Sequence, residues 1–451
     1  MTCKYSGCSG LTSVTIPNSV TSIGWNAFHS CRSLTSITIP ESVTIIGEGA
    51  FYDCYVTAES FINNTSLTDL YYWSPSICDE ETNDGLLLQS FYDDYYVVAC
   101  RPWATSITIP EDVTTIWESA FEGCSSLTSV IIPDGVTSIG KSAFEGCSSL
   151  TSITIGSGVK SIGARAFLEC NALEQVHITD LAAWCNISFC NDTYYDYAYY
   201  SQPLYYAHHL YLNGQEVKDL VIPEGVTSIS DYVFSDCSNL TSVTIPSSVT
   251  SIGSYTFSNC KALEAVHITD LAAWCNISFD YRICNPLFYV HHLYMNGQEV
   301  KDLVIPEGVT SIGDYVFNEC SNLTSVTIPS SVTSIGNEAF CFCRGIKEIY
   351  CYAEETPEVK SSYDGSFYGV DVSKVLLVVP DEAVEKYKAH EVWGQFMIET
   401  PTGLEAIHNP QFIIQNEDAI YNLDGQRVSA LQRGINIIRR NDGTAKKVLK
   451  R

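Results

Sequence analysis

Positively charged side chains are scarce in this chain, which has 24 Lys and Arg against 52 Asp and Glu and a formal net charge of -28 at pH 7. So acidic a surface repels the phosphate backbone of DNA and RNA. Residues 1–400 also contain no basic stripe interleaved with aromatic residues, which is the usual footprint of a nucleic-acid binder. We therefore expect no nucleic-acid partner.

Long apolar runs are absent as well. No stretch of about 18 apolar residues occurs, so the sequence predicts no transmembrane segment. The start, MTCKYSGCSGLTSV, does not resemble a signal peptide and opens inside a repeat. Because an uncapped first repeat would expose its apolar end, we expect the N-terminus to be incomplete.

The motifs of common enzyme classes are missing too. The sequence has no Gly-x-Ser-x-Gly elbow, no P-loop, no Gly-x-Gly-x-x-Gly after a strand and no His-Glu-x-x-His. Adjacent carboxylates such as Glu80-Glu81 lie in expected loops, where solvated charge is their usual role. We expect a protein without enzymatic activity and without a cofactor.

What the chain does have is a repeat of 23 residues, marked by a cysteine at one fixed position. A period of this length is typical of a stacked-repeat solenoid, whose long surface suits binding. The repeating cysteines are Cys8, Cys31 and Cys54, then Cys124, Cys147 and Cys170, then Cys237 and Cys260, then Cys320 and Cys343.

One repeat contains two short strands and a turn. Residues 127–132 alternate inward and outward as a strand does, and Pro133 ends that strand. Residues 136–139 form a second apolar stretch on the opposite wall, and residues 143–147 fit a single helical turn. One repeat buries too little to offset its own ordering entropy, so we expect stability to come from stacking.

Ten of the 19 cysteines occupy the same repeat position, which favours a buried column of free thiols. Disulfides are the alternative, because neighbouring repeats lie about 4.8 Å apart, within reach of a disulfide bridge. Strict equivalence of the positions and the odd total favour thiols.

The pattern Cys-x-x-Leu-Thr-Ser-Val-Thr-Ile-Pro-x-Ser-Val-Thr-Ser-Ile-Gly-x-x-Ala-Phe resembles the BspA-type leucine-rich repeat of bacterial surface proteins. The resemblance covers roughly residues 5–343. It implies an α/β repeat solenoid dominated by β-structure, right-handed, with short strands and single helical turns. It also implies a non-enzymatic role in surface attachment and protein binding.

Three islands interrupt the repeats of the solenoid, which we place at residues 1–343. They are residues 55–103, 180–216 and 270–299. The second and third are copies of each other, so a block of three repeats has been duplicated.

Both copies carry the same local signals. Asn213-Gly214 and Asn296-Gly297 predict two-residue hairpin turns. Asp180 and Asp270 each precede Leu-Ala-Ala-Trp-Cys and fit the N-caps of short helices.

The end of the chain departs from the repeat. We expect residues 344–400 to cap the solenoid, and residues 401–451 to form a small β module. The second segment resembles the C-terminal sorting domain of the type IX secretion route, which implies an extracellular or cell-surface protein. A small β module with a basic solvated tail is the alternative.

Histidines occur at two places that invite a functional interpretation. His177 and His267 replace the outward Thr of the first strand, so we expect them on the concave face, as ligand contacts or as tolerated surface residues. The pairs His208-His209 and His291-His292 suggest metal, but neighbours on a strand point to opposite faces and no zinc spacing accompanies them. We expect no metal.

The islands are rich in tyrosine, which recognition loops favour for its large amphipathic contact area. These rings either grip a ligand or seal the flank of the solenoid. The candidate ligand-binding residues there are Tyr71, Tyr72 and Trp73, and Tyr194, Tyr195, Tyr197, Tyr199 and Tyr200. The predicted function is adhesion or binding of a protein; the alternatives are a structural spacer at the cell surface and glycan binding through the tyrosine-rich loops.

Overall fold

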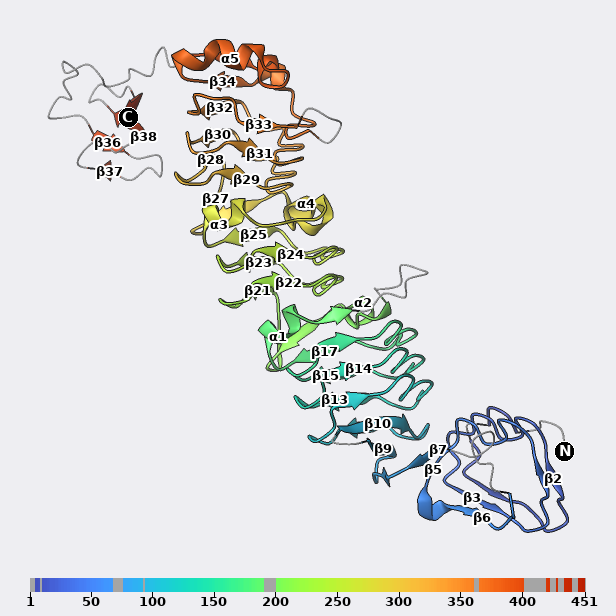
Figure 1. The fold of residues 1–451 in the computed structure, drawn as a ribbon. Coiled ribbons are helices and arrows are strands. Elements are labelled where there is room, and N and C mark those ends of the chain that lie inside the picture. The colour runs from blue at the N-terminus through green and yellow to red at the C-terminus, as the bar shows by residue number, and fades with distance from the viewer. Residues whose placement is uncertain are drawn as a thin grey trace. The chain divides into compact units, whose positions relative to one another are not determined.

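The computed structural model describes residues 5–8, 10–67, 76–91, 94–189, 200–360 and 365–400, and four strands between residues 419 and 450. The chain divides into two compact units, Met1–Thr269 with Ile283–Val290 and Asp270–Arg282 with His291–Arg451. Within each unit, the short strands of successive repeats lie side by side, as β13 (Ser129–Ile132) and β15 (Ser152–Ile155) do in Figure 1.

Two sheets run through the middle repeats of the first unit, one from each strand of the repeat. The first has the order β11 (Ser106–Thr108), β13, β15, β17 (Gln175–Ile178), β19 (Leu210–Leu212) and β20 (Gln215–Glu216). The opposite sheet has the order β18 (Ser188–Phe189), β16 (Ser161–Ile162), β14 (Ser138–Ile139), β12 (Thr115–Ile116), β10 (Asp94–Cys100), β9 (Leu86–Phe91) and β8 (Glu80–Glu81). Only the hairpins β8–β9–β10 and β19–β20 are antiparallel in these two sheets.

The same unit holds the repeats on either side. The first repeats contain β1 (Ser13–Thr15), β3 (Ser36–Ile39) and β6 (Phe61–Asn63), with β2 (Ser22–Ile23), β4 (Ile45–Ile46), β5 (Tyr55–Thr57) and β7 (Ser76–Cys78). Later repeats contain β21 (Asp219–Val221), β23 (Ser242–Ile245) and β25 (Ala265–Ile268), with β22 (Ser228–Ile229) and β24 (Ser251–Ile252). Its short helices include η1 (Ala58–Ser60), α1 (Leu181–Cys185), α2 (Leu204–Ala207) and α4 (Leu287–Val290).

The second unit has the same arrangement of two parallel sheets. It begins with α3 (Leu271–Cys275) and the hairpin β26 (Leu293–Met295) and β27 (Gln298–Glu299). Its parallel sheets are β28 (Asp302–Val304), β30 (Ser325–Ile328), β32 (Glu348–Cys351), β34 (Leu376–Val378) and β35 (Met397–Glu399), and β29 (Ser311–Ile312), β31 (Ser334–Ile335) and β33 (Glu358–Val359). Its short helices include η4 (Val372–Lys374), η5 (Asp381–Ala383), α5 (Val384–Ala389) and η6 (Trp393–Gln395).

Near the C-terminus, four strands form an antiparallel sheet. In spatial order they are β37 (Arg427–Val428), β36 (Ala419–Tyr421), β38 (Gly434–Arg439) and β39 (Ala445–Lys450). The parallel repeat strands and the few short helices confirm the predicted β-dominated repeat solenoid.

Side chains of equivalent repeat positions form continuous buried columns. Val130 pairs in register with Ile153, and both are almost fully buried. Phe144 stacks between Phe121 and Phe167, with ring centroids 4.7 and 5.3 Å away. Each repeat therefore covers the apolar face of the next.

The segment with the predicted helical turn, residues 140–147, is a run of i to i+3 turns that adds a third ladder. The N–H groups of Ser142, Phe144 and Gly146 donate to carbonyls one repeat further on, at 2.9, 2.8 and 2.8 Å. Positive φ angles at Ser142 (54°) and Gly146 (73°) accompany this arrangement. Backbone groups that a buried turn would leave unpaired are thus bonded between repeats.

The cysteine column belongs to this ladder. The thiol of Cys147 donates to the carbonyl of Phe121 at 3.0 Å, and Cys170 to that of Phe144 at 3.1 Å. Cysteine is thus a small apolar residue that also supplies a weak donor. Every cysteine in the described part of the chain is free.

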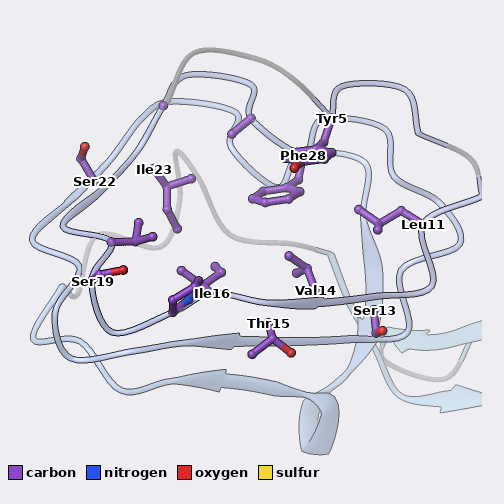
Figure 2. Close-up of a pocket in the computed structure, with 14 residues that line it drawn as sticks. Tyr5, Leu11, Ser13, Val14, Thr15, Ile16, Ser19, Ser22, Ile23 and Phe28 are labelled. Carbon is purple, nitrogen blue, oxygen red and sulfur yellow. The ribbon is translucent and has the colours of Figure 1, made fainter.

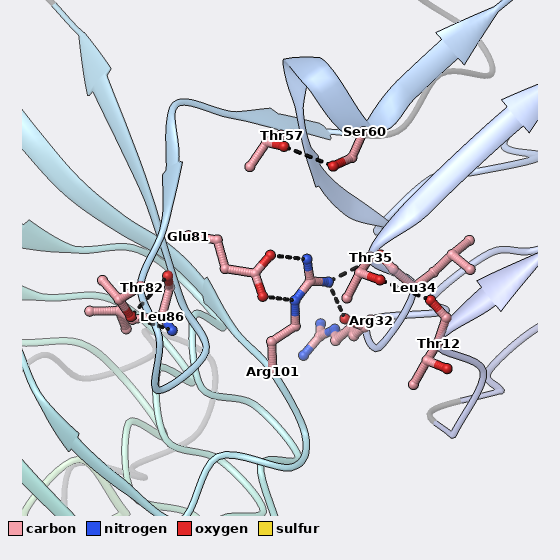
Figure 3. A network of polar contacts seen from close by, with 10 residues as sticks. All are labelled: Thr12, Arg32, Leu34, Thr35, Thr57, Ser60, Glu81, Thr82, Leu86 and Arg101. Atoms are coloured by element: carbon pink, nitrogen blue, oxygen red, sulfur yellow. Dashed lines mark hydrogen bonds and ion pairs between the residues drawn. The ribbon is translucent and has the colours of Figure 1, made fainter.

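Arg101 joins the first island to the repeats before it. Its side chain is fully buried and forms a forked ion pair with Glu81, at 3.0 and 2.7 Å. Figure 3 shows the same guanidinium reaching the backbone carbonyls of Arg32 and Leu34, which it bonds at 2.9 and 3.1 Å. One cation therefore satisfies a carboxylate and two carbonyls at once.

We expect Arg101→Lys to lower the free energy of unfolding by about 3 kcal/mol, because an ammonium group cannot reproduce the fork and both carbonyl bonds. The urea midpoint and slope measure this loss. The exposed Lys160→Ala should change stability by less than about 0.5 kcal/mol. Equal stability of Arg101→Lys and the parent protein would contradict the assigned role of the guanidinium.

Stability should also fall in alkali because of the cysteine column. Burial raises the pKa of Cys170 and Cys260 from 9.0 to about 12. The unfolded thiols ionise first, so the stability they contribute is complete below pH 9.0 and decreases as the pH rises toward 12. Urea midpoints across this range should decrease, and less so in Cys170→Ala. Identical pH profiles for the two proteins would refute this explanation.

Candidate functional site

An outward-facing row of side chains follows the first parallel sheet of the solenoid, one residue per repeat. We call it the outer row. In the middle repeats of the first unit it consists of Thr108, Ile131, Thr154, His177 and Tyr211, which pair in register on adjacent strands. In the later repeats of that unit it consists of Val221, Thr244 and His267.

The outer row is chemically richest around His177. The His177 ring stacks on Tyr211 with centroids 4.8 Å apart, and its Nε2 lies 3.1 Å from the Oε1 of Gln175. Burial lowers the pKa of His177, so a neutral imidazole is favoured. Ile131, two strands away, has 47% of its surface exposed. The row thus offers aromatic, imidazole and aliphatic surfaces without a charged group of its own.

Three hydrogen-bonded side chains, Glu216, His209 and Asn239, lie at the adjoining hairpin β19–β20. We call this cluster the Glu216 hub. Glu216 is directly opposite Tyr211 in the β19–β20 pair. Its Oε1 lies 2.6 Å from the Nδ1 of His209 and accepts from the side-chain amide of Asn239 at 2.9 Å. The bond from Asn239, followed by the contact with His209, lowers the pKa of Glu216. The Glu216 hub therefore fixes the position of the β19–β20 hairpin, on which Tyr211 lies.

The second unit contains the equivalent hub. The Nδ1 of His292 lies 2.6 Å from the Oε1 of Glu299, which also accepts from Asn322 at 2.7 Å. The contact with His292, followed by that with Asn322, lowers the pKa of Glu299. The duplicated block therefore preserves its hydrogen bonding as well as its sequence.

The predicted local signals of the islands are confirmed. Asp180 caps α1 by accepting from the N–H of Ala183 at 2.7 Å, and Asp270 caps α3 in the same way. The Asn-Gly pairs of both hairpins have positive φ angles at both residues, as this tight turn requires.

Helix α1 also anchors the second island to the repeat that follows it. The indole of Trp184 is almost fully buried and donates to the carbonyl of Val233 at 3.1 Å. The buried amide of Gln202 donates to the carbonyl of Tyr232 at 2.9 Å. Residues 200–207 are therefore part of the folded core rather than a removable loop.

The structure places only some of the predicted site residues. His177 and His267 lie on the outer row, but in different sheets, so they do not form one site. Tyr200 lies edge-on to Tyr205 with centroids 5.6 Å apart, and both line a cavity with Tyr232 and Tyr255. The remaining candidates, Tyr71, Tyr72, Trp73, Tyr194, Tyr195, Tyr197 and Tyr199, lie outside the described residues.

The sequence interpretation missed Tyr211, Gln175 and the Glu216 hub. Part of this set could have been predicted from the Asn213-Gly214 turn. A two-residue hairpin pairs the residues on either side of the turn, and this pairing puts Tyr211 opposite Glu216. Asn239 has no comparable local signal.

Across the residues with described positions, no three His, Cys, Asp or Glu side chains form a group able to hold a metal ion. Nor does that part of the chain contain a helix long and apolar enough to cross a membrane.

A second hollow lies in the first repeat. It has a volume of about 400 Å³ and is lined by Leu11, Val14, Ile16, Ile23 and Phe28, which Figure 2 shows pointing into it. β1 is the edge strand of its sheet, so this hollow is the apolar cross-section of the repeat itself. We assign it no ligand.

Parallel strands stacked at a fixed repeat, with apolar columns inside and an outward-facing row of side chains, define a leucine-rich repeat solenoid. The sequence profile of the BspA type leucine rich repeat region, in six copies, matches residues 2–80, 98–199, 207–283 and 290–381. The chain belongs to the BspA-type leucine-rich repeat family. Members of this family are typically non-enzymatic scaffolds that bind proteins.

Several solved structures resemble the chain. A leucine-rich repeat protein from Bacteroides ovatus is 24% identical over 68% of this chain and 80% of its own, with a TM-score of 0.36. A leucine rich cell surface protein from Faecalibacterium prausnitzii is 22% identical over 71% and 93%, with a TM-score of 0.31. The pneumococcal vaccine antigen PcpA is 17% identical over 66% and 78%, with a TM-score of 0.29. No curated protein matches the chain.

The hub gives a testable pH dependence. Because the pKa of Glu216 is lowered from 4.5, its carboxylate stabilises the fold above pH 4.5 and loses this effect as the pH falls through the folded value. Asn239→Ala should raise that pKa, cost about 1 kcal/mol at neutral pH and flatten the acid branch of the stability curve. NMR titration of the Glu216 carboxyl and thermal melts check this. The pKa of Glu216 should be unchanged in the control Asn322→Ala; an equal shift in both variants would exclude local hydrogen bonding as the cause.

Proposed function

We propose that this protein is a non-enzymatic binder that contacts a protein partner through the outer row of its first unit. The observation behind the proposal is the exposed Ile131 in register with the His177–Tyr211 stack. Aromatic anchors surrounded by polar groups are the usual high-affinity centres of protein interfaces. Three strand spacings of about 4.8 Å separate Ile131 from Tyr211, a span that suits the centre of such an interface.

Rigid support strengthens the case for this surface. Tyr211 is held by strand pairing on both sides and by the Glu216 hub, so little side-chain entropy is lost when a partner binds. The acidic chain, with a net charge of -28, would favour a basic partner surface. Family membership supports the same class of function.

Placement at the cell surface is part of this proposal. It is supported by the family and by the resemblance of residues 401–451 to a type IX sorting domain. In this proposal residues 1–343 present the binding surface, residues 344–400 cap the solenoid, and the last segment directs export.

Binding to a panel of immobilised extracellular-matrix proteins tests the proposal. Ile131→Glu and Tyr211→Ala should each weaken binding at least tenfold, because each removes an anchor worth about 2 kcal/mol. The matched control is Ile45→Glu, which changes another exposed isoleucine, 65% accessible, on the second strand of its repeat. Equal effects of all three variants would refute the outer row as the contact, and absence of binding by the parent protein would favour a structural spacer.

A further inference from the structure

A tyrosine-lined cavity lies where the second island meets the repeats that follow it. Its volume of about 450 Å³ falls in the range of small-ligand sites. Its lining residues are Tyr200, Tyr205, Tyr232, Ser235, Asp236, Tyr255, Ser258 and Asn259. All of them belong to the first unit, and none belongs to the outer row.

The aromatic side of the cavity presents ring faces in two orientations. Tyr232 and Tyr255 occupy the same position in successive repeats and stack with centroids 5.2 Å apart and an interplanar angle of 15°. Tyr200 and Tyr205 meet edge to face at 5.6 Å and 79°. The N–H of Tyr232 donates to the carbonyl of Ser254 at 3.0 Å, so this ring projects from the ladder between repeats.

The polar side is organised around Asp236, which is 8% exposed. Its carboxylate accepts from the hydroxyl of Ser235 at 2.6 Å and from the amide of Asn259 at 3.0 Å. An ionised carboxylate has about four acceptor positions, so these two bonds orient the group and leave acceptor capacity for a ligand. Ser258 adds a hydroxyl to the lining.

Ring faces next to fixed hydrogen-bonding groups suit a sugar. The C–H face of a pyranose packs on an aromatic ring, while its hydroxyls bond carboxylate, amide and hydroxyl groups. A quaternary ammonium ion would use the rings and the carboxylate but would form no hydrogen bonds with the serines or Asn259. The buried carboxylate and the net charge of -28 oppose an anionic glycan.

We propose that this cavity binds a neutral carbohydrate, with the exposed Tyr255, backed by the buried Tyr232, as the stacking surface and Asp236 and Asn259 as the hydroxyl-binding pair. The site is separate from the protein-binding outer row and does not depend on it. The protein thus carries two recognition surfaces of different chemistry.

The duplicated block contains an internal comparison, 83 residues further along. The scaffold is unchanged there, since the capped helix, its tryptophan and the hub all recur. Tyr232 is kept as Tyr315, but the other lining positions differ: Tyr200, Tyr205, Ser235, Asp236, Tyr255, Ser258 and Asn259 correspond to Ile283, Phe288, Asn318, Glu319, Glu338, Cys341 and Phe342. The duplicate therefore keeps the fold and the tyrosine at the position of Tyr232, but it lacks the counterparts of Tyr200, Tyr205 and Tyr255 and the amide of Asn259.

This comparison supplies variants that should fold. Tyr255 and Asn259 have φ angles of 57° and 59°, and their counterparts Glu338 and Phe342 have 48° and 57°. The double variant Tyr255→Glu, Asn259→Phe therefore places in this repeat two side chains that the same backbone already accepts elsewhere. Circular dichroism and the melting temperature confirm that the fold is retained.

The test uses saturation-transfer difference NMR and titration of the full chain with methyl glucoside, methyl galactoside and methyl mannoside. At least one sugar should bind, and the double variant should weaken it at least about tenfold through loss of stacking and hydrogen bonds. Tyr52→Ala, which removes an exposed tyrosine of the first repeats, should leave the affinity unchanged, as should Tyr211→Ala on the outer row.

The opposite outcomes overturn the proposal. Absence of saturation transfer from all three sugars, or equal binding by the double variant, excludes a carbohydrate site in this cavity. Binding of tetramethylammonium in place of the sugars would assign the cavity to a cation.

One further result would support the proposal. Loss of protein binding in Tyr211→Ala together with retained sugar binding would show that this site is separate from the outer row.

Discussion

The constraint on which the structure depends is the fixed offset between repeats. At an offset of 23 residues, Val130 meets Ile153, Phe121 stacks on Phe144, and the turn N–H groups meet their carbonyls. A slip of one residue would reverse the facing of both strands and break every ladder together. The second island preserves the ladder where it rejoins the stack: the carbonyl of Tyr200 accepts from the N–H of Phe167, as a repeat residue would.

The islands supply side chains that do not recur from repeat to repeat. A column of equivalent residues presents the same side chain many times. The second island instead contributes Tyr200 and Tyr205, which line a cavity together with the repeat residues Tyr232 and Tyr255. Gln202, which attaches the island to the next repeat, lies in the sequence between Tyr200 and Tyr205, which line the cavity. Sealing the flank of the solenoid and lining a binding site are therefore compatible roles for the side chains of the island.

Much of the fold was predictable from local patterns. The cysteine and phenylalanine spacing predicted the stack and the free thiols, and the Asn-Gly and capping Asp signals predicted the hairpins and short helices. The Arg101 contacts were not predictable, because they join residues 67 and 69 positions apart across an island of irregular length. Asn239 and Tyr255 were missed for a related reason: each looks like an ordinary variable position of its repeat.

The sequence by itself determined the repeat unit, its inward and outward faces and its offset, because these follow from the order of apolar residues within one period. Only the tertiary structure decided which residues of different repeats share a surface. Tyr200 lines one cavity with Tyr232 and Tyr255, and Tyr211 stacks on His177. Both arrangements follow from the path of the island, which sets where the chain rejoins the stack. That path depends on long-range packing of Trp184 and Gln202, which no local period encodes.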